Sequence, residues 1–299
     1  MKNILIIGYG EMGHAMEHLL SPVHDLKRWN RHPVPGCEVV DLEAAAANAD
    51  IIIFCVPVNP IAALARRILP SLSSRSISLS IAKGLNETGH TAAGVFEDVY
   101  GKRFDYGLLY GPMISEEIRA DRPAFAQLGA RDRDIFDRVT ALFSHTRLYL
   151  EYTDDICGIS WSAVLKNVYA MVIGAADELA LGDNMRGYLM VAAMHEMDAI
   201  VMQLGGSATT SHHLAGLGDL VTTATSASSH HHELGGMLVR GELDAIRGEG
   251  IHTLAMVRKH ALINFDDYPL FKLAQRMVDA PVDIEGKIRE YLKQKFPPA

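Results

Sequence analysis

Residues 3–13 read NILIIGYGEMG, and this stretch decides the fold of the first half of the 299-residue chain. The apolar run at its start is typical of a strand, and Glu11–Leu20 has the apolar spacing of a helix. Gly8, Gly10 and Gly13 give the pattern G-x-G-x-x-G between the two. A pattern of this kind between a strand and a helix indicates a dinucleotide-binding turn.

Each glycine of this turn has a physical purpose. Gly8 permits the tight turn, Gly10 lets the backbone approach a pyrophosphate, and Gly13 allows the helix to pack closely on the strand. The helix start, with Glu11 and Met12, offers backbone N–H groups to the phosphates. The alternative is a glycine turn that binds no ligand.

The end of the second predicted strand, His24–Trp29, bears on the choice of cofactor. A site specific for NAD usually has a carboxylate there to hold the ribose 2′-hydroxyl. This chain has Asn30 and Arg31 instead. Because Arg31 can contact a 2′-phosphate, the sequence favours NADP over NAD. Use of both cofactors and a solvated surface arginine remain alternatives.

Strands and helices alternate through the first half of the chain. Further strands are predicted at Ile51–Val56, Ser76–Ile81, Tyr106–Tyr110 and Arg147–Tyr152, with a helix at Ile61–Leu69. This alternation predicts a doubly wound α/β domain. The second half shows only helical patterns, at Cys157–Leu181, Met185–Leu204, His230–Val239 and Phe271–Val278. The predicted boundary therefore lies at residue 152, between domains of residues 1–152 and 153–299.

Composition narrows the class of protein. With 28 Lys+Arg against 36 Asp+Glu, the formal charge of −8 gives no general attraction to nucleic acid. Three widely spaced cysteines, Cys37, Cys55 and Cys157, form no disulfide framework, which fits a reducing cytoplasm. The N-terminal apolar run is too short for a signal peptide, and Ile159–Leu181 carries charged residues. We therefore expect a soluble protein without membrane insertion.

Six short segments, in order, carry a family resemblance. They are Ile81-Ala82-Lys83-Gly84-Leu85, Tyr110-Gly111-Pro112, Ala163-Val164-Leu165-Lys166-Asn167-Val168, Leu181-Gly182-Asp183-Asn184, Leu214-Ala215-Gly216-Leu217-Gly218-Asp219-Leu220 and Gly248-Glu249-Gly250. With these segments the chain resembles the bacterial-type NAD(P)-dependent glycerol-3-phosphate dehydrogenases over essentially its whole length. The resemblance implies a Rossmann-like N-terminal domain, an all-α C-terminal substrate domain and a homodimer. It also implies hydride transfer between NAD(P)H and dihydroxyacetone phosphate, which gives sn-glycerol 3-phosphate.

The resemblance also implies catalytic roles. Lys166 matches the family's catalytic lysine, the general acid/base at the reacting carbonyl. Lys83 matches a second active-site lysine, near substrate and cofactor, and Asp219 matches an acidic residue that orients Lys166 or binds a substrate hydroxyl. From the residues alone, Lys166 could instead be a surface lysine, Lys83 a loop charge and Asp219 a helix N-cap.

Binding roles follow from the same resemblance. Asn167, Thr223 and Gly111 match positions around the substrate. Glu249 matches a position near the nicotinamide ribose.

One segment departs from the family's pattern. Where the family has Ser-Arg-Asn-Arg before a helix, this chain reads Ser228-Ser229-His230-His231-His232-Glu233. His230 falls on the arginine and His231 on the asparagine that hold the substrate phosphate. Neutral histidine offers one N–H donor, whereas arginine offers a permanent positive charge and two parallel N–H donors for a bidentate contact.

Three explanations of this departure stay open. The substrate is still phosphorylated, or the site takes another small hydroxy or keto compound, or the chain is a non-catalytic NADP-binding sensor or scaffold. The histidines, with His212 and His213, lack the spacing of a metal site, so no metal is predicted.

Overall fold

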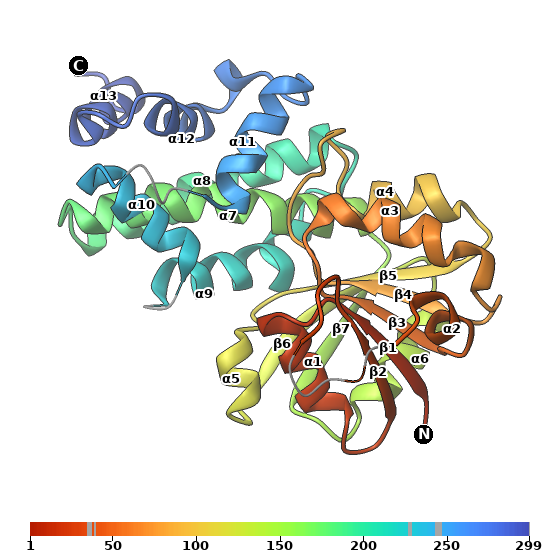
Figure 1. The fold of residues 1–299 in the computed structure, drawn as a ribbon. Helices are drawn as coiled ribbons and strands as arrows, with labels where there is room; N and C mark the ends of the chain where they lie inside the picture. Colours follow the sequence, from red (N-terminus) through yellow and green to blue (C-terminus); the bar gives the residue numbers. More distant parts are fainter. Residues whose placement is uncertain (35–37, 39, 227–228, 243–246, 299) are drawn as a thin grey trace. The chain divides into compact units, whose positions relative to one another are not determined.

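The computed structural model describes residues 1–34, 38, 40–226, 229–242 and 247–298 (Figure 1). Cys37 and Ser228, which the sequence analysis used, lie outside these residues. The chain divides into two compact units, Met1–Asn86 with His90–Ser160, and Glu87–Gly89 with Trp161–Ala299. This division falls inside a helix, whereas the boundary predicted from sequence is at residue 152.

The first unit is built on a seven-stranded sheet. Its strands are β1 (Asn3–Ile7), β2 (Asp25–Trp29), β3 (Ile51–Phe54), β4 (Ile77–Ser80), β5 (Asp105–Tyr110), β6 (Ala124–Ala130) and β7 (Leu148–Thr153). They are ordered β2-β1-β3-β4-β5-β6-β7, and all neighbours are parallel except β5 and β6. The doubly wound α/β prediction is confirmed. Strand β6 was not predicted, because its Ala and Gly residues have low β propensity.

Helices cover both faces of this sheet (Figure 1). They are α1 (Glu11–Leu20), α2 (Leu42–Ala47), α3 (Val58–Ile68), α4 (Ala92–Tyr100), α5 (Ser115–Arg119) and α6 (Arg133–Thr140), with short 3₁₀ turns at Leu69–Ser71 and Ala141–Phe143. On one face, α1, α5 and α6 share a core with Ile4 and Ile6 of β1. On the other, Phe54 of β3 meets Phe96 of α4, edge to face, with 5.4 Å between ring centroids. Burial on both faces explains the unbroken apolar strands.

The strand order reverses beside β1, and this fixes where a ligand can bind. The chain passes from β1 to β2 on one side and then crosses to β3 on the other. In open parallel sheets, ligands bind outside the carboxyl ends of the strands at such a reversal. The glycine turn follows β1 directly at this point, and its Gly8 N–H donates to the Trp29 carbonyl at the end of β2, at 2.8 Å.

The described residues of the second unit form helices and connecting turns, and none of them forms a strand. Its helices are α7 (Ile156–Glu178), which begins in the first unit, α8 (Asp183–Gln203), α9 (Asp219–Thr225), α10 (His230–Arg240), α11 (Glu249–Lys259), α12 (Pro269–Asp279) and α13 (Ile284–Lys295). Shorter turns lie at Thr210–His212, Leu214–Gly218 and Phe265–Asp267. Among the described helices, α7 alone is long and apolar enough to cross a membrane, but 89% of that window is buried, as in a core helix.

A buried carboxylate joins α8 to α12. Glu196, only 8% exposed, accepts hydrogen bonds from the backbone N–H groups of Leu270 and Phe271, at 2.7 and 2.8 Å, and from the Tyr169 hydroxyl. It therefore satisfies donors at the start of α12 that have no partner within the helix. Burial raises the pKa of Glu196, and the three hydrogen bonds oppose that rise.

We predict that Glu196→Gln lowers the free energy of unfolding by about 1–3 kcal/mol, because one amide oxygen cannot accept all three bonds and the amide nitrogen faces a donor. Denaturant unfolding measures the change. Glu285→Gln, at an exposed carboxylate paired with Arg289, is the control and should change stability by less than about 0.5 kcal/mol. Equal losses in the two variants would contradict the role given to Glu196.

Candidate functional site

The glycine turn has the shape of a phosphate cradle. Gly8 has φ +97°, and a Cβ there would lie 2.5 Å from the Cys55 carbonyl oxygen. A Cβ on Gly13 would lie 2.3 Å from the Gly8 carbonyl oxygen, so α1 packs directly on the turn. Nothing lies within 4 Å of a Cβ on Gly10, which leaves its surface open to a ligand. The environments of Gly8 and Gly13 fit the tight turn and the close packing expected from the sequence, and the approach of a pyrophosphate at Gly10 stays a prediction.

The start of α1 leaves backbone donors for an anion. No side chain caps Gly10, the residue before the helix. The Glu11 carboxylate pairs with Arg119 at 3.0 Å, and Met12 packs against the core that contains Ile4 and Ile6 of β1. Both side chains are therefore engaged elsewhere, and only the backbone N–H groups of this helix start suit an anion.

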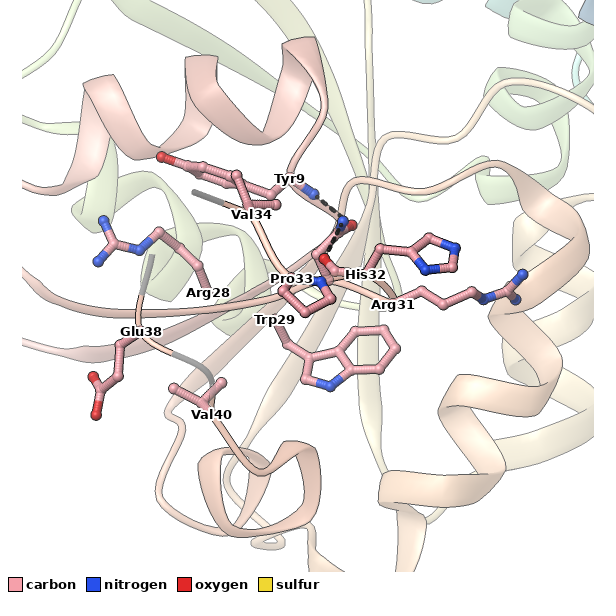
Figure 2. A pocket seen from close by; sticks show the side chains of 10 residues that line it. Tyr9, Arg28, Trp29, Arg31, His32, Pro33, Val34, Glu38 and Val40 are labelled. Atoms are coloured by element: carbon pink, nitrogen blue, oxygen red, sulfur yellow. Dashed lines mark hydrogen bonds between the residues drawn. The ribbon is translucent and has the colours of Figure 1, made fainter. Parts of the chain in front are cut away.

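A pocket of about 180 Å³ lies beside the turn at the end of β2 (Figure 2). Its lining includes Tyr9, Trp29, Asn30, Arg31 and His32. The Asn30 side chain accepts from the Tyr9 N–H at 3.3 Å and donates to the His32 carbonyl at 3.0 Å. Asn30 thus ties the glycine turn to the loop after β2.

Two arginines of this pocket differ in their surroundings. Arg28 pairs with the Glu17 carboxylate, which also accepts the Tyr9 hydroxyl. Arg31 is exposed, and its guanidinium makes no hydrogen bond or ion pair within the described part of the chain. Figure 2 shows Arg31 extending away from Tyr9. Its charge is therefore available to an anionic group in a way that the charge of Arg28 is not.

The carboxyl ends of β4 and β5 hold Lys83. Its Nζ donates to the Gly111 carbonyl at 3.2 Å, and the buried Tyr110 hydroxyl donates to the Ala82 carbonyl at 2.7 Å. A Cβ on Gly111 would lie 2.5 Å from the Phe125 carbonyl oxygen, so only glycine fits there. Lys83 is therefore held against the neighbouring strand end rather than free in a loop. Tyr110 thus positions the residue before Lys83, a role that was not predicted from the sequence.

A buried lysine lies at the centre of the second unit. Lys166, on α7, is 5% exposed. Its Nζ donates to Thr223 Oγ1 at 2.6 Å and lies 3.3 Å from Asp219 Oδ2. Asp219 and Thr223 are 4% and 7% exposed. The surface-lysine alternative is wrong, because a snorkelling lysine keeps its ammonium in water.

The backbone directly before Asp219 has an unusual conformation. Residues Leu214–Gly218 form one wide π-helical turn directly before α9. Gly218 occupies the N-cap position and Asp219 is the first helical residue, so the N-cap alternative for Asp219 is wrong. Turns of this kind often occur at functional sites. Here the turn brings the Asp219 carboxylate to Lys166.

The next residue of α7 contacts the start of α11. Asn167 is fully buried, and its Nδ2 donates to Glu249 Oε2 at 3.3 Å. A Cβ on Gly250 would lie 2.8 Å from the Asn167 carbonyl oxygen, so the two helices touch there. Lys166, Asn167, Asp219, Thr223 and Glu249 therefore form one connected group.

The three histidines His230, His231 and His232 begin α10. The Ser229 side chain caps the helix by accepting from the His232 N–H. His230 Nε2 lies 2.8 Å from the Arg247 carbonyl oxygen, and His232 Nε2 lies 2.8 Å from Asp177 on α7. The His231 ring stands roughly perpendicular to that of His230, with 5.8 Å between centroids.

No group of three His, Cys, Asp or Glu side chains is arranged to hold a metal ion within the residues described. His212, considered above as a metal ligand, bonds to Asp198.

We predict that the Lys166–Asp219 pair shows the energetics of a buried ion pair. Lys166→Met and Asp219→Asn should each lower the free energy of unfolding by about 3–5 kcal/mol, because each leaves a buried charge without its partner. The double variant should lose much less than the sum of the two.

Denaturant unfolding of the four proteins measures this coupling. The exposed pair Lys272–Asp266 provides the control cycle, with a coupling below about 1 kcal/mol. Additive losses at Lys166 and Asp219 would contradict the ion pair.

Comparisons with known proteins identify the family. Models described as the N-terminus and the C-terminus of NAD-dependent glycerol-3-phosphate dehydrogenase match residues 33–135 and 155–287. The glycerol-3-phosphate dehydrogenase (NAD(P)+) of Moorella thermoacetica is 30% identical, over 87% of this chain and 86% of its own. The enzyme of that name from Nitratidesulfovibrio vulgaris is 28% identical, over 98% of both chains.

A solved structure agrees at the level of the fold. The crystal structure of glycerol-3-phosphate dehydrogenase from Coxiella burnetii superposes with a TM-score of 0.85 at 23% identity, over 98% of this chain and 99% of that one. The chain belongs to the NAD-dependent glycerol-3-phosphate dehydrogenase family.

Proposed function

We propose that this protein is an NAD(P)-dependent dehydrogenase that interconverts dihydroxyacetone phosphate and sn-glycerol 3-phosphate. The observation that carries the proposal is the buried group of Lys166, Asp219 and Thr223. The relatives that match along the whole chain carry the name of this activity.

The residues around Lys166 suit the proton-transfer step of the reaction. A bound nicotinamide cofactor would supply the hydride for the substrate's carbonyl carbon. Lys166 then gives a proton from Nζ to the carbonyl oxygen, which becomes the alcohol, and regains a proton from solvent. Asp219 and Thr223 hold Nζ in one orientation meanwhile. In the reverse direction Lys166 accepts the alcohol proton.

The other predicted residues divide between cofactor and substrate. In this proposal residues 1–152 bind the dinucleotide, with its pyrophosphate on the glycine turn and Lys83 near both ligands. Residues 153–299 carry the substrate chemistry, with Glu249 near the nicotinamide ribose and Asn167, Thr223, His230 and His231 around the substrate. Gly111, whose carbonyl accepts from Lys83, is also placed beside the substrate in this proposal.

NADP is the favoured cofactor in this proposal. Arg31 offers a guanidinium that pairs with no described residue, beside the pocket at the end of β2, and position 30 is an asparagine rather than a carboxylate that could hold a 2′-hydroxyl. A 2′-phosphate would therefore gain a charge-assisted contact there.

A second candidate is a related dehydrogenase with a different small hydroxy or keto substrate. The observation that favours it is His230, whose Nε2 contacts a backbone carbonyl and is not available to a phosphate in that state.

Location and assembly are part of the proposal. Cys55 and Cys157 form no disulfide within the described residues, which suits a reducing cytoplasm, and burial raises the pKa of both. A homodimer rests on the family resemblance, and sedimentation would test it. A small molecule is the expected partner, with no nucleic acid and no membrane insertion.

We predict NADPH oxidation when dihydroxyacetone phosphate is added to the purified protein. Lys166→Ala should lower kcat by about 100- to 10,000-fold, because the proton donor is lost, while cofactor affinity stays unchanged. Steady-state absorbance kinetics and NADPH titration measure the two effects. Lys272→Ala, at an exposed lysine, is the control.

The outcomes separate the candidates. Turnover of a non-phosphorylated ketone or keto acid but not of dihydroxyacetone phosphate would select the second candidate. Tight NADPH binding without turnover of any carbonyl compound would make the chain a sensor or scaffold. A near-normal rate in Lys166→Ala would remove that residue from its role.

We also predict that Arg31→Ala weakens NADPH binding about 10- to 100-fold and NADH binding much less, since only NADPH carries the 2′-phosphate. Fluorescence titration of both cofactors measures the two affinities. Arg122→Ala, on an exposed arginine paired with Glu117, should change neither. Equal weakening of NADPH and NADH by Arg31→Ala would refute the contact.

A further inference from the structure

An arginine outside the predicted site lies next to the histidines that depart from the family pattern. Arg247 stands two residues before Glu249, is exposed, and has no hydrogen bond or ion pair from its guanidinium to any residue that the structure describes. Nearby arginines of the same unit are engaged: Arg240 pairs with Glu178, Glu233 and Glu242, and Arg258 with Asp279. Arg247 therefore has its full charge available.

The backbone of Arg247 is fixed by His230. The Arg247 carbonyl oxygen lies 2.8 Å from His230 Nε2. A carbonyl only accepts, so Nε2 carries the hydrogen, and Nδ1 of the neutral ring has none to donate. The neutral His230 ring consequently has no N–H left for an anion. It uses its one donor to hold the segment that carries Arg247.

Packing holds this segment between α10 and α7. A Cβ on Gly248 would lie 2.5 Å from Leu234 Cδ1 and 3.3 Å from His230 Nε2, so the backbone lies flat on α10. One residue later, Glu249 accepts from Asn167, the neighbour of Lys166. The segment 247–249 therefore runs from the first turn of α10 to the group around the buried lysine.

The first turn of α10 is itself held against α7. A Cβ on Gly174 of α7 would lie 2.0 Å from the His232 carbonyl oxygen, and one on Gly235 of α10 would lie 2.0 Å from the Met171 carbonyl oxygen. The two helices cross at backbone contact, and His232 adds its bond to Asp177. The His230 ring thus stands on a rigid support.

We propose that Arg247 determines specificity for the phosphate group of the substrate, and that His230 is the positioning residue that holds it. The proposal rests on the function proposed above. A guanidinium supplies the permanent charge and the paired donors that a phosphate prefers, which the neutral imidazole at position 230 lacks. In this proposal the positive charge and the paired N–H donors for the phosphate come from Arg247, just before α11, and not from the first turn of α10.

The test compares a phosphorylated with a non-phosphorylated substrate, with NADPH saturating. Arg247→Ala should raise KM for dihydroxyacetone phosphate by about 10- to 100-fold, as loss of a charge-assisted contact does. Its kcat/KM for dihydroxyacetone should stay unchanged, because that ketone has no phosphate. Arg276→Ala, on an exposed arginine paired with Glu290, is the matched control and should change neither.

The role of His230 is tested by rescue. His230→Ala should raise KM for dihydroxyacetone phosphate because the Arg247 backbone loses its donor. His230→Gln should restore it in large part, since the glutamine amide can donate to the same carbonyl. If Ala and Gln variants have equal KM values, His230 does not act through Arg247.

The outcomes distinguish this inference from the proposed function. If the wild-type protein reduces dihydroxyacetone phosphate and Arg247→Ala leaves KM unchanged, the inference is overturned and the function stands. If the wild type does not reduce dihydroxyacetone phosphate, the proposed function fails. The role of Arg247 is then tested separately, by calorimetric titration of the NADPH-loaded protein with inorganic phosphate. Weaker phosphate binding by Arg247→Ala than by the wild type supports the phosphate-binding role of Arg247. Equal binding by the two proteins, or no binding by either, overturns that role.

Discussion

The ion pair between Lys166 and Asp219 is the constraint on which the second unit depends. Both side chains are almost fully buried, and a buried charge is tolerated only when it is paired and hydrogen-bonded. The pair requires α7 and α9 to approach at one register, and the π-helical turn at Leu214–Gly218 supplies that approach. A buried ion pair adds little net stability. Under the proposed function, the pair holds a proton donor in one orientation.

The first unit obeys a different constraint, the close approach of backbones at the end of β1. Gly8 and Gly13 are required because any side chain would collide with backbone, whereas Gly10 is open. Asn30 then ties the turn to the loop after β2 through two hydrogen bonds. If a dinucleotide binds at this turn, as proposed, Tyr9, Asn30 and His32 are already held in place before it binds.

Sequence patterns could predict what local residues determine, namely the strands β1 to β5 and β7, the helices α1, α3, α7, α8, α10 and α12, and the glycine turn. Strand β6 could not be predicted, because its small residues form a strand only through pairing with β5 and β7. From the residues alone Lys166 could be a surface lysine, and only its burial in the folded chain excludes that alternative. The contact of His230 with Arg247 joins residues 17 positions apart, and no local pattern indicates it.

The central claim is that Lys166 acts on the reacting oxygen from a buried, preorganised position. A crystal structure of the protein with NADP⁺ and sn-glycerol 3-phosphate tests it most directly. The account predicts Lys166 Nζ within about 3 Å of the substrate's C2 oxygen, with Asp219 and Thr223 still on the same ammonium group. A substrate bound elsewhere, with Nζ still enclosed by Asp219 and Thr223 alone, would contradict it.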